Sequence, residues 1–362
     1  IPPPKRLKVS IKPPFKLLKN LTLSYSHSKN LSNIKKSALM KKMSEATKEK
    51  RIVVIGGGTG VFTVLSGLKK YPLHLSAIVS MADDGGSTGL LREEFGILPP
   101  GDVRRALVAL AKTDYRLMSE LFNYRFSEGL LSGHNFGNLF ITALERLTGN
   151  FEKAIYEAGK VLAIQGEVIP VTLDSAKLYA ELENGVIVSG ETNIDIPKHD
   201  PSLKIKKVFL RPVCEANTKA IEAVKKADLI VLGPGDLYTS LIPNLLVKGI
   251  LSAIRASKAK KVYLCNLMTK LGETNKFAAL DFADEIENYL GKAVLNYFIV
   301  NKTQPAEDRL RRYSEEKAIL VEHKKSDFKG KKYKTISADL LRKNGFIRHD
   351  PDKLAKLLLS LI

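Results

Sequence analysis

The chain has 362 residues, of which 44% are hydrophobic, and it carries a formal net charge of +20 with two cysteines. This length suits one large α/β domain or two ordinary ones. Cys214 and Cys265 form no CxxC pair and no zinc-ligand set, and the low cysteine usage fits a reducing cytoplasm. The sequence also contains no apolar run long enough to predict a membrane span.

The positive charge lies at the two ends of the chain. Residues 1–42 have no acidic residue and carry +11, residues 302–362 form a C-terminal basic segment of +7, and residues 43–301 carry +2. We predict that residues 1–42 are a disordered extension, with a polybasic arm for nucleic acid or anionic lipid as the alternative. Residues 43–362 then form one α/β domain, whose near-neutral body does not indicate specific nucleic-acid binding.

The segment "RIVVIGGGTG" begins this domain with a strand, a glycine loop and a helical pattern. Residues 52–55 are β-branched and apolar, as in a buried parallel strand. Val61 breaks the dinucleotide fingerprint, which argues against a dinucleotide-dependent oxidoreductase, and no Walker lysine follows. Glycines and a helix N-terminus still suit a phosphate group, while the alternative is a tight turn that binds nothing. The candidate ligand-binding residues are Gly56, Gly57, Gly58, Thr59 and Gly60.

The next predicted strand, residues 73–80, runs directly into "MADDGGSTG". Asp83 and Asp84 are candidates to bind Mg²⁺ or to accept a proton from an attacking hydroxyl. Asp102 is a second candidate metal ligand beside Asp83, and it is equally suited to cap the helix that follows. The alternative for the aspartate loop is a simple turn. Further candidate ligand contacts are Gly85, Gly86, Ser87, Arg92 and Arg104, with the arginines placed to balance phosphate charge.

Three later polar loops repeat this theme at the ends of predicted strands or the starts of helices. In "GHNFGN" the histidine suits a phosphate and the amides suit a hydroxyl or a base, although a lone histidine at a helix start is more often structural. The loops "GPGDLYTS" and "CNLMT" suit a second phosphate or a sugar. The candidates are His134, Asn135, Asn138, Gly233, Gly235, Asp236, Tyr238, Ser240, Asn266 and Thr269.

Between these loops, strand and helix patterns alternate except at about residues 167–210. There the apolar residues recur at every second position, and Asn184-Gly185 is typical of a hairpin turn. We therefore predict a Rossmann-like, doubly wound and mostly parallel sheet with an antiparallel β insertion. Ligands of such sheets bind beyond the carboxyl ends of the strands, where the polar loops are expected to meet.

Five motifs in this order resemble the CofD/YvcK family. They are "GGGTG", "ADDGGSTGLLREEFGILPPGDVRRALVALA", "GHNFGNLFITAL", "GPGDLYTSLIPNLLVKGI" and "VYLCNLMTKLGET", and the similarity covers about residues 51–361. "LFNYRF" and "FIRHDPDKLAKLL" bring the chain closest to the YvcK branch, the gluconeogenesis factors. The resemblance implies a cytoplasmic regulator of cell shape and cell-wall precursor metabolism in gluconeogenic growth, which binds UDP-sugars such as UDP-N-acetylglucosamine.

The resemblance also implies roles for particular residues. Tyr313 and Arg348 correspond to a tyrosine and an arginine associated with the UDP-sugar, and a homodimer is expected. The CofD branch implies an alternative: a 2-phospho-L-lactate transferase that moves phospholactate from a nucleotide diphosphate carrier to a deazaflavin alcohol. Asp83 and Asp84 would then be catalytic. The chain departs from the family at Pro351, where some members have a phosphorylatable threonine, and at residues 280–282, where relatives show Ser-Asp-His.

Overall fold

The computed structural model describes residues 50–362. The predicted disordered extension at 1–42 lies outside the described residues. Within the described part of the chain, no helix has the length and apolar character needed to cross a membrane.

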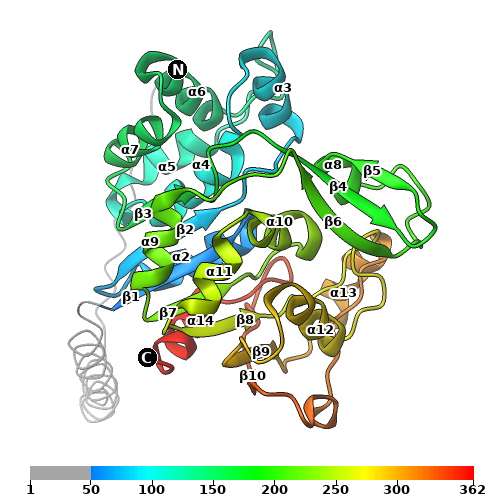
Figure 1. The fold of residues 1–362 in the computed structure, drawn as a ribbon. Helices are drawn as coiled ribbons and strands as arrows, with labels where there is room; N and C mark the ends of the chain where they lie inside the picture. The colour runs from blue at the N-terminus through cyan, green and yellow to red at the C-terminus, as the bar shows by residue number, and fades with distance from the viewer. Residues whose placement is uncertain (1–49) are drawn as a thin grey trace, which may run out of the picture. The chain divides into compact units, whose positions relative to one another are not determined.

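A seven-stranded sheet organises the domain (Figure 1). Its order is β10-β9-β8-β7-β1-β2-β3, and every neighbouring pair is parallel. The central strands are apolar throughout, and Ile52, Val54 and Ile55 are fully buried, as expected for strands covered on both faces. The strands are β1 (Arg51–Gly56), β2 (His74–Val79), β3 (Glu167–Pro170), β7 (Leu229–Leu232), β8 (Lys260–Leu264), β9 (Tyr297–Asn301) and β10 (Lys334–Ala338).

Two groups of helices cover the sheet, one on each face, as right-handed crossovers require. The helices α2 (Gly58–Leu68), α4 (Pro100–Leu110) and α14 (Pro351–Leu359) pack together, and α9 (Thr218–Lys226), α10 (Ile242–Leu246) and α11 (Ile250–Ala256) form the other group (Figure 1). The remaining helices are α3 (Gly86–Phe95), α5 (Arg116–Asn123), α6 (Phe136–Thr148), α7 (Phe151–Val161), α12 (Ala279–Leu290) and α13 (Glu307–Glu315), with short helical turns η1 (Thr113–Tyr115), η2 (Leu237–Leu241) and η3 (Lys325–Phe328).

The strand order also places the topological switch point of the sheet. From β1 the chain moves outward to β2 and β3 on one side, whereas β7, β8, β9 and β10 extend on the other side. The crevice beyond β1 and β7 is therefore where a doubly wound sheet binds its ligand. The fold confirms the predicted α/β class.

The antiparallel insertion is a three-stranded sheet of order β5-β4-β6 with one short helix, α8 (Glu191–Asp195). Its strands are β4 (Lys177–Leu182), β5 (Ile187–Ser189) and β6 (Ile205–Arg211), and the turn between β4 and β5 contains Gly185 with φ of +85°. The predicted start at residue 167 is too early. The segment 167–170 pairs in parallel with β2 at the edge of the main sheet, because its buried apolar residues complete that sheet.

Candidate functional site

A pocket of about 490 Å³ lies at the switch point, beyond the carboxyl ends of β1, β2 and β7. Four segments of the main domain contribute to it: the glycine loop after β1, the aspartate loop after β2, the start of α4, and the loop after β7. The helix α8 of the insertion forms another part of the lining. Three of the loops that sequence analysis singled out, those after β1, β2 and β7, thus converge on one cavity, together with Asn138.

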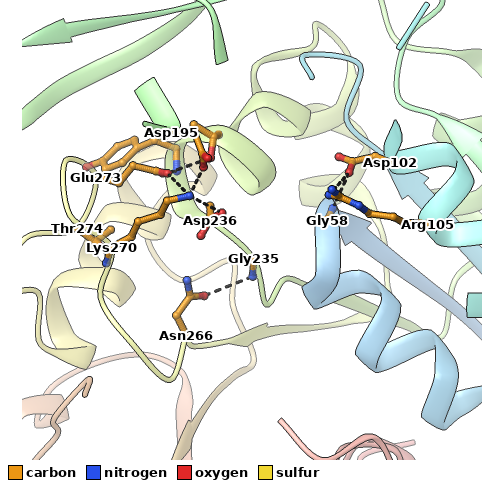
Figure 2. Close-up of polar contacts among 12 residues, drawn as sticks. Gly58, Asp102, Arg105, Asp195, Gly235, Asp236, Asn266, Lys270, Glu273 and Thr274 are labelled. Carbon is orange, nitrogen blue, oxygen red and sulfur yellow. Dashed lines mark hydrogen bonds and ion pairs between the residues drawn. The ribbon is translucent and has the colours of Figure 1, made fainter. Parts of the chain in front are cut away.

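The glycine loop is packed against the start of α4 and the loop after β7. The backbone N–H of Gly58 donates to Oδ1 of Asp102 at 2.8 Å, as Figure 2 shows. A Cβ on Gly57 would collide with the carboxylate of Asp102, and one on Gly60 would collide with the backbone carbonyl of Pro234. Glycine is required at both positions for this close packing, which brings the N-terminus of α2 to the pocket.

Asp83 and Asp102 form a pair of carboxyl groups on either side of Gly101. Oδ1 of Asp83 accepts from the N–H of Gly85 at 3.0 Å, and a Cβ on Gly101 would collide with Oδ2 of Asp83. Burial first, and then the charge of Asp83, raises the pKa of Asp102 to about 6. The hydrogen bonds that Asp102 accepts from described residues use Oδ1, so its Oδ2 is available to another ligand. Two close carboxylates with available oxygens fit the donor set of Mg²⁺.

Three arginines supply positive charge to the pocket: Arg104, Arg105 and Arg125. Arg104 is only 6% exposed, and its guanidinium donates to Oδ1 of Asn138 at 3.0 Å and to Oδ1 of Asn123 at 2.6 Å. Burial, followed by the other two arginines, lowers its pKa to about 10, so it stays charged at neutral pH. Arg105 forms an ion pair of 3.4 Å with Asp102 (Figure 2).

The insertion presents α8 to the same cavity. Glu191, Thr192, Asp195 and Ile196 line the pocket. Burial first, and then Asp83 among the neighbouring carboxylates, raises the pKa of Glu191 to about 9. This acid is therefore protonated at neutral pH and is able to donate a hydrogen bond.

Asp84 faces away from the cavity that Asp83 lines. Its two carboxylate oxygens accept from the N–H groups of Glu191 at 3.2 Å and Thr192 at 2.8 Å. Asp84 is not among the residues that line the pocket. Its role in this structure is to hold the first turn of α8.

The pocket separates the remaining sequence candidates into two groups. Those that line it are Gly57, Gly58, Thr59, Gly60, Asp83, Gly85, Gly86, Ser87, Asp102, Arg104, Asn138, Gly235, Asp236 and Ser240. Those outside its lining are Gly56, Asp84, Arg92, His134, Asn135, Gly233, Tyr238, Asn266, Thr269, Tyr313 and Arg348. Pocket residues that sequence analysis missed are Thr88, Gly101, Arg105, Arg125, Glu191, Thr192, Asp195, Ile196 and Thr239.

Several of the outer candidates have a visible structural role instead. The guanidinium of Arg92 donates to the backbone carbonyls of Asp83 at 2.9 Å and Ala176 at 3.0 Å, so it joins the aspartate loop to the insertion. Asn135 caps α6, and Thr269 accepts from the N–H of Ile319. The contacts of Arg92 with Ala176 and of Thr269 with Ile319 join residues 84 and 50 positions apart, so local patterns do not reveal them, whereas the cap by Asn135 is local to α6.

Tyr313 and Arg348 come from distant segments that meet where Tyr313 contacts Ile347, the residue before Arg348. The hydroxyl of Tyr313 accepts from the N–H of Ile347 at 3.0 Å, and both residues pack in an apolar cluster with Leu267. The preceding residue, Asn266, accepts from the N–H of Gly235 at 3.4 Å (Figure 2). Arg348 is exposed, with its guanidinium 5.2 Å from the ring of Phe346.

A doubly wound sheet with a glycine loop and arginines at its switch point is typical of α/β proteins that bind phosphorylated ligands. Residues 52–341 match the family described as 2-phospho-L-lactate transferase CofD, so the chain belongs to the CofD family.

Curated relatives of this chain are named gluconeogenesis factor. The protein of that name from Listeria innocua is 45% identical over 88% of this chain and 98% of its own length. The one from Bacillus subtilis is 41% identical over 86% and 98%, respectively. A crystal structure of a UPF0052-family protein from Bacillus halodurans superposes with a TM-score of 0.82 at 42% identity, covering 86% of this chain and 99% of that one.

Proposed function

We propose that the switch-point pocket binds a nucleotide diphosphate-linked sugar of the UDP-N-acetylglucosamine type. In this proposal the protein is a cytoplasmic regulator of cell shape and cell-wall precursor metabolism in gluconeogenic growth. Its membership of the CofD family and the names of its relatives support this reading. The proposal rests on the residues of the pocket rather than on the fold alone, because one fold hosts many functions.

The single observation that carries the proposal is the convergence of phosphate-binding groups on one cavity. The glycine loop brings the N-terminus of α2, an eleven-residue helix, to the pocket, and Arg104, Arg105 and Arg125 lie around the same space. Backbone N–H groups at a helix start bind anions, and guanidinium groups bind phosphate oxygens in pairs. A diphosphate is therefore the ligand group that best matches these donors.

Asp83 and Asp102 are the residues that would hold a Mg²⁺ ion next to the diphosphate. Asp83 lies close enough for its charge to raise the pKa of Asp102. Such an ion would neutralise phosphate charge in a pocket that also contains Glu191, Asp195 and Asp236. The chain's own contribution is the position of Oδ2 on each aspartate, which close packing determines: against Gly101 for Asp83 and against Gly57 for Asp102.

The sugar end of the ligand is proposed to extend past Asn266 toward Tyr313 and Arg348. Asn266 contacts the pocket loop through Gly235, and the next residue, Leu267, packs with the cluster that contains Tyr313. This path connects the phosphate-binding groups with the two residues that sequence resemblance associated with UDP-sugars.

Calorimetry with UDP, UDP-N-acetylglucosamine and UDP-glucose, each with and without Mg²⁺, tests the proposal. Arg105→Ala should weaken UDP-sugar binding by about 10- to 100-fold, since it removes a guanidinium from the phosphate region. Arg116→Ala is the matched control, because Arg116 is an exposed arginine on α5 that pairs only with Glu120 among the described residues. No binding of any UDP compound to the folded wild-type protein would refute the proposal.

A second candidate function is the transferase named by the family description. The acidic groups around the pocket favour it, because Asp83 and the protonated Glu191 could serve as base and acid in group transfer. Incubation with a phospholactate nucleotide and a deazaflavin alcohol, followed by mass spectrometry, distinguishes the two. A transferase forms product that disappears in Asp83→Asn, whereas a UDP-sugar regulator forms none.

A homodimer is also expected from the family resemblance. Light scattering on the wild-type protein measures whether it forms.

A further inference from the structure

Lys270 is the centre of an ion cluster that includes two pocket residues, Asp195 and Asp236 (Figure 2). Its ammonium contacts the carboxylate of Asp195 in α8, and it lies 3.0 Å from Oδ2 of Asp236 and 3.6 Å from Oε1 of Glu273. Asp195 and Asp236 are also pocket residues. The lysine thus joins three elements: the insertion, the loop after β7 and the loop after β8.

Glu273 anchors this cluster to the main domain. Its side chain is fully buried, and its carboxylate accepts from the N–H of Tyr238 and the hydroxyl of Thr239, both at 3.1 Å. Carboxylate oxygens of Asp195, Asp236 and Glu273 lie within 4.8 Å of one another. Burial first, and then Asp236, raises the pKa of Glu273 to about 8. At neutral pH the ammonium of Lys270 therefore mainly offsets the charges of Asp195 and Asp236, which are partly exposed.

The main domain therefore contacts α8 through charged groups at both ends of the helix. Asp84 accepts from the N–H groups of Glu191 and Thr192 in the first turn, and Lys270 contacts Asp195, the last residue of the helix. Between these two contacts α8 presents Glu191 and Thr192 to the pocket. The geometry of this side of the pocket thus depends on two charged contacts as well as on the insertion's own sheet.

We propose that Lys270 is a positioning residue that holds α8 against the pocket and thereby determines how long the pocket retains its ligand. Lys270 acts through Asp195 and Asp236 rather than as part of the pocket lining. For its effect on ligand retention, this inference rests on the proposed nucleotide-sugar function. Its effect on α8 itself does not depend on which ligand binds.

The first experiment needs no ligand. Hydrogen exchange is measured by mass spectrometry on the full chain as wild type, Lys270→Met and Lys331→Met. Lys331 is the matched control, since its ammonium also contacts two carboxylates, those of Asp284 and Glu287, neither of which lines the pocket. Lys270→Met should speed exchange in peptides covering residues 189–197 by about tenfold or more relative to those of α2, and Lys331→Met should not.

The second experiment measures dissociation of UDP-N-acetylglucosamine by stopped flow in the presence of Mg²⁺. Lys270→Met should raise the dissociation rate by about tenfold, and Lys270→Arg, which keeps the charge, should recover most of the wild-type rate. In a double-mutant cycle, Asp195→Asn should have little further effect once Lys270 is Met, because the two residues act through one contact.

The outcomes separate the two proposals. Faster exchange in α8 without binding of any UDP-sugar supports the positioning role of Lys270 but refutes the proposal that the pocket binds a UDP-sugar. If Lys270→Met lowers the melting temperature no more than Lys331→Met, and changes neither α8 exchange nor ligand dissociation, the positioning role is wrong. If Lys270→Met does not fold, Asp195→Asn replaces it, since it removes the other partner of the same contact. Asp195→Asn should then speed α8 exchange and ligand dissociation while Lys270→Arg stays close to the wild type, and an Asp195→Asn variant without either change would overturn the inference.

Discussion

The two sides of the pocket are built on different physical principles. The side formed by the parallel sheet consists of loops that follow β1, β2 and β7, and it depends on the close packing of glycines such as Gly57, Gly60 and Gly101. The side formed by α8 belongs to the antiparallel insertion, and charged contacts with Asp84 and Lys270 join it to the rest of the domain. Close packing of the loops holds the first side in place, whereas contacts with charged side chains hold α8 in place on the second side.

Two adjacent residues illustrate this difference. Asp83 lines the cavity, where its carboxylate lies against Gly101. Asp84, one residue later, accepts two backbone hydrogen bonds from α8. The same type of side chain thus lines the pocket in one position and holds the insertion in the next.

The largest effect is expected where packing on the sheet side is broken. Gly60→Ala should lower the free energy of unfolding by about 3 kcal/mol, since its Cβ would collide with the backbone carbonyl of Pro234. Urea denaturation measures the change. The control, Thr59→Ala, alters an exposed neighbour and should stay within about 0.5 kcal/mol. Equal stability of the two variants would show that the glycine loop and the loop after β7 can move apart at little cost in free energy.

The next effect concerns the carboxylate pair on the sheet side. Asp102→Asn should weaken UDP-sugar binding by about tenfold in Mg²⁺, because an amide is a poorer ligand than a carboxylate for a hard cation. Calorimetry in EDTA should show a smaller difference between variant and wild type. A loss of the same size in EDTA would mean that Asp102 acts through Gly58 and Arg105 rather than through a metal ion.

On the insertion side, a pH dependence is expected from Glu191. Its pKa is raised from the ordinary 4.5 to about 9, so the stability it contributes is fully present below pH 4.5 and is lost as the pH rises through 9. Melting temperatures between pH 5 and 9.5 should therefore fall more steeply for the wild type than for Glu191→Gln. Parallel pH profiles for the two proteins would contradict the buried, protonated state of Glu191.

The smallest effect is expected at the outer end of the proposed ligand path. Arg348 is exposed and lies over Phe346 rather than in the pocket, so Arg348→Ala should weaken UDP-N-acetylglucosamine binding only about two- to fivefold. Binding of UDP itself should not change, since UDP lacks the N-acetylglucosamine group. A loss of about a hundredfold or more would place Arg348 against the diphosphate and require this segment to move toward the pocket.

The parallel sheet, its glycine loop and the position of Asp83 were predictable because each depends on local sequence. Continuous apolar runs indicate buried parallel strands, and the carboxyl ends of such strands meet at one edge. The insertion was also recognisable from its alternating pattern and the Asn184-Gly185 turn, because Asn-Gly suits the backbone geometry of a tight hairpin turn. Only its start was misplaced, since periodicity does not reveal which sheet a short strand such as 167–170 will join.

Tertiary structure alone decided how the insertion contacts the rest of the domain. Arg92 donates to the carbonyl of Ala176, 84 residues away, and Lys270 contacts Asp195, 75 residues away. Such contacts follow from how the insertion folds back over the sheet, which no local pattern encodes. The amino-acid sequence by itself therefore determined the scaffold and one side of the pocket. The other side depends on long-range electrostatic contacts, whose energy exists only once the folded chain brings the charges together and buries them.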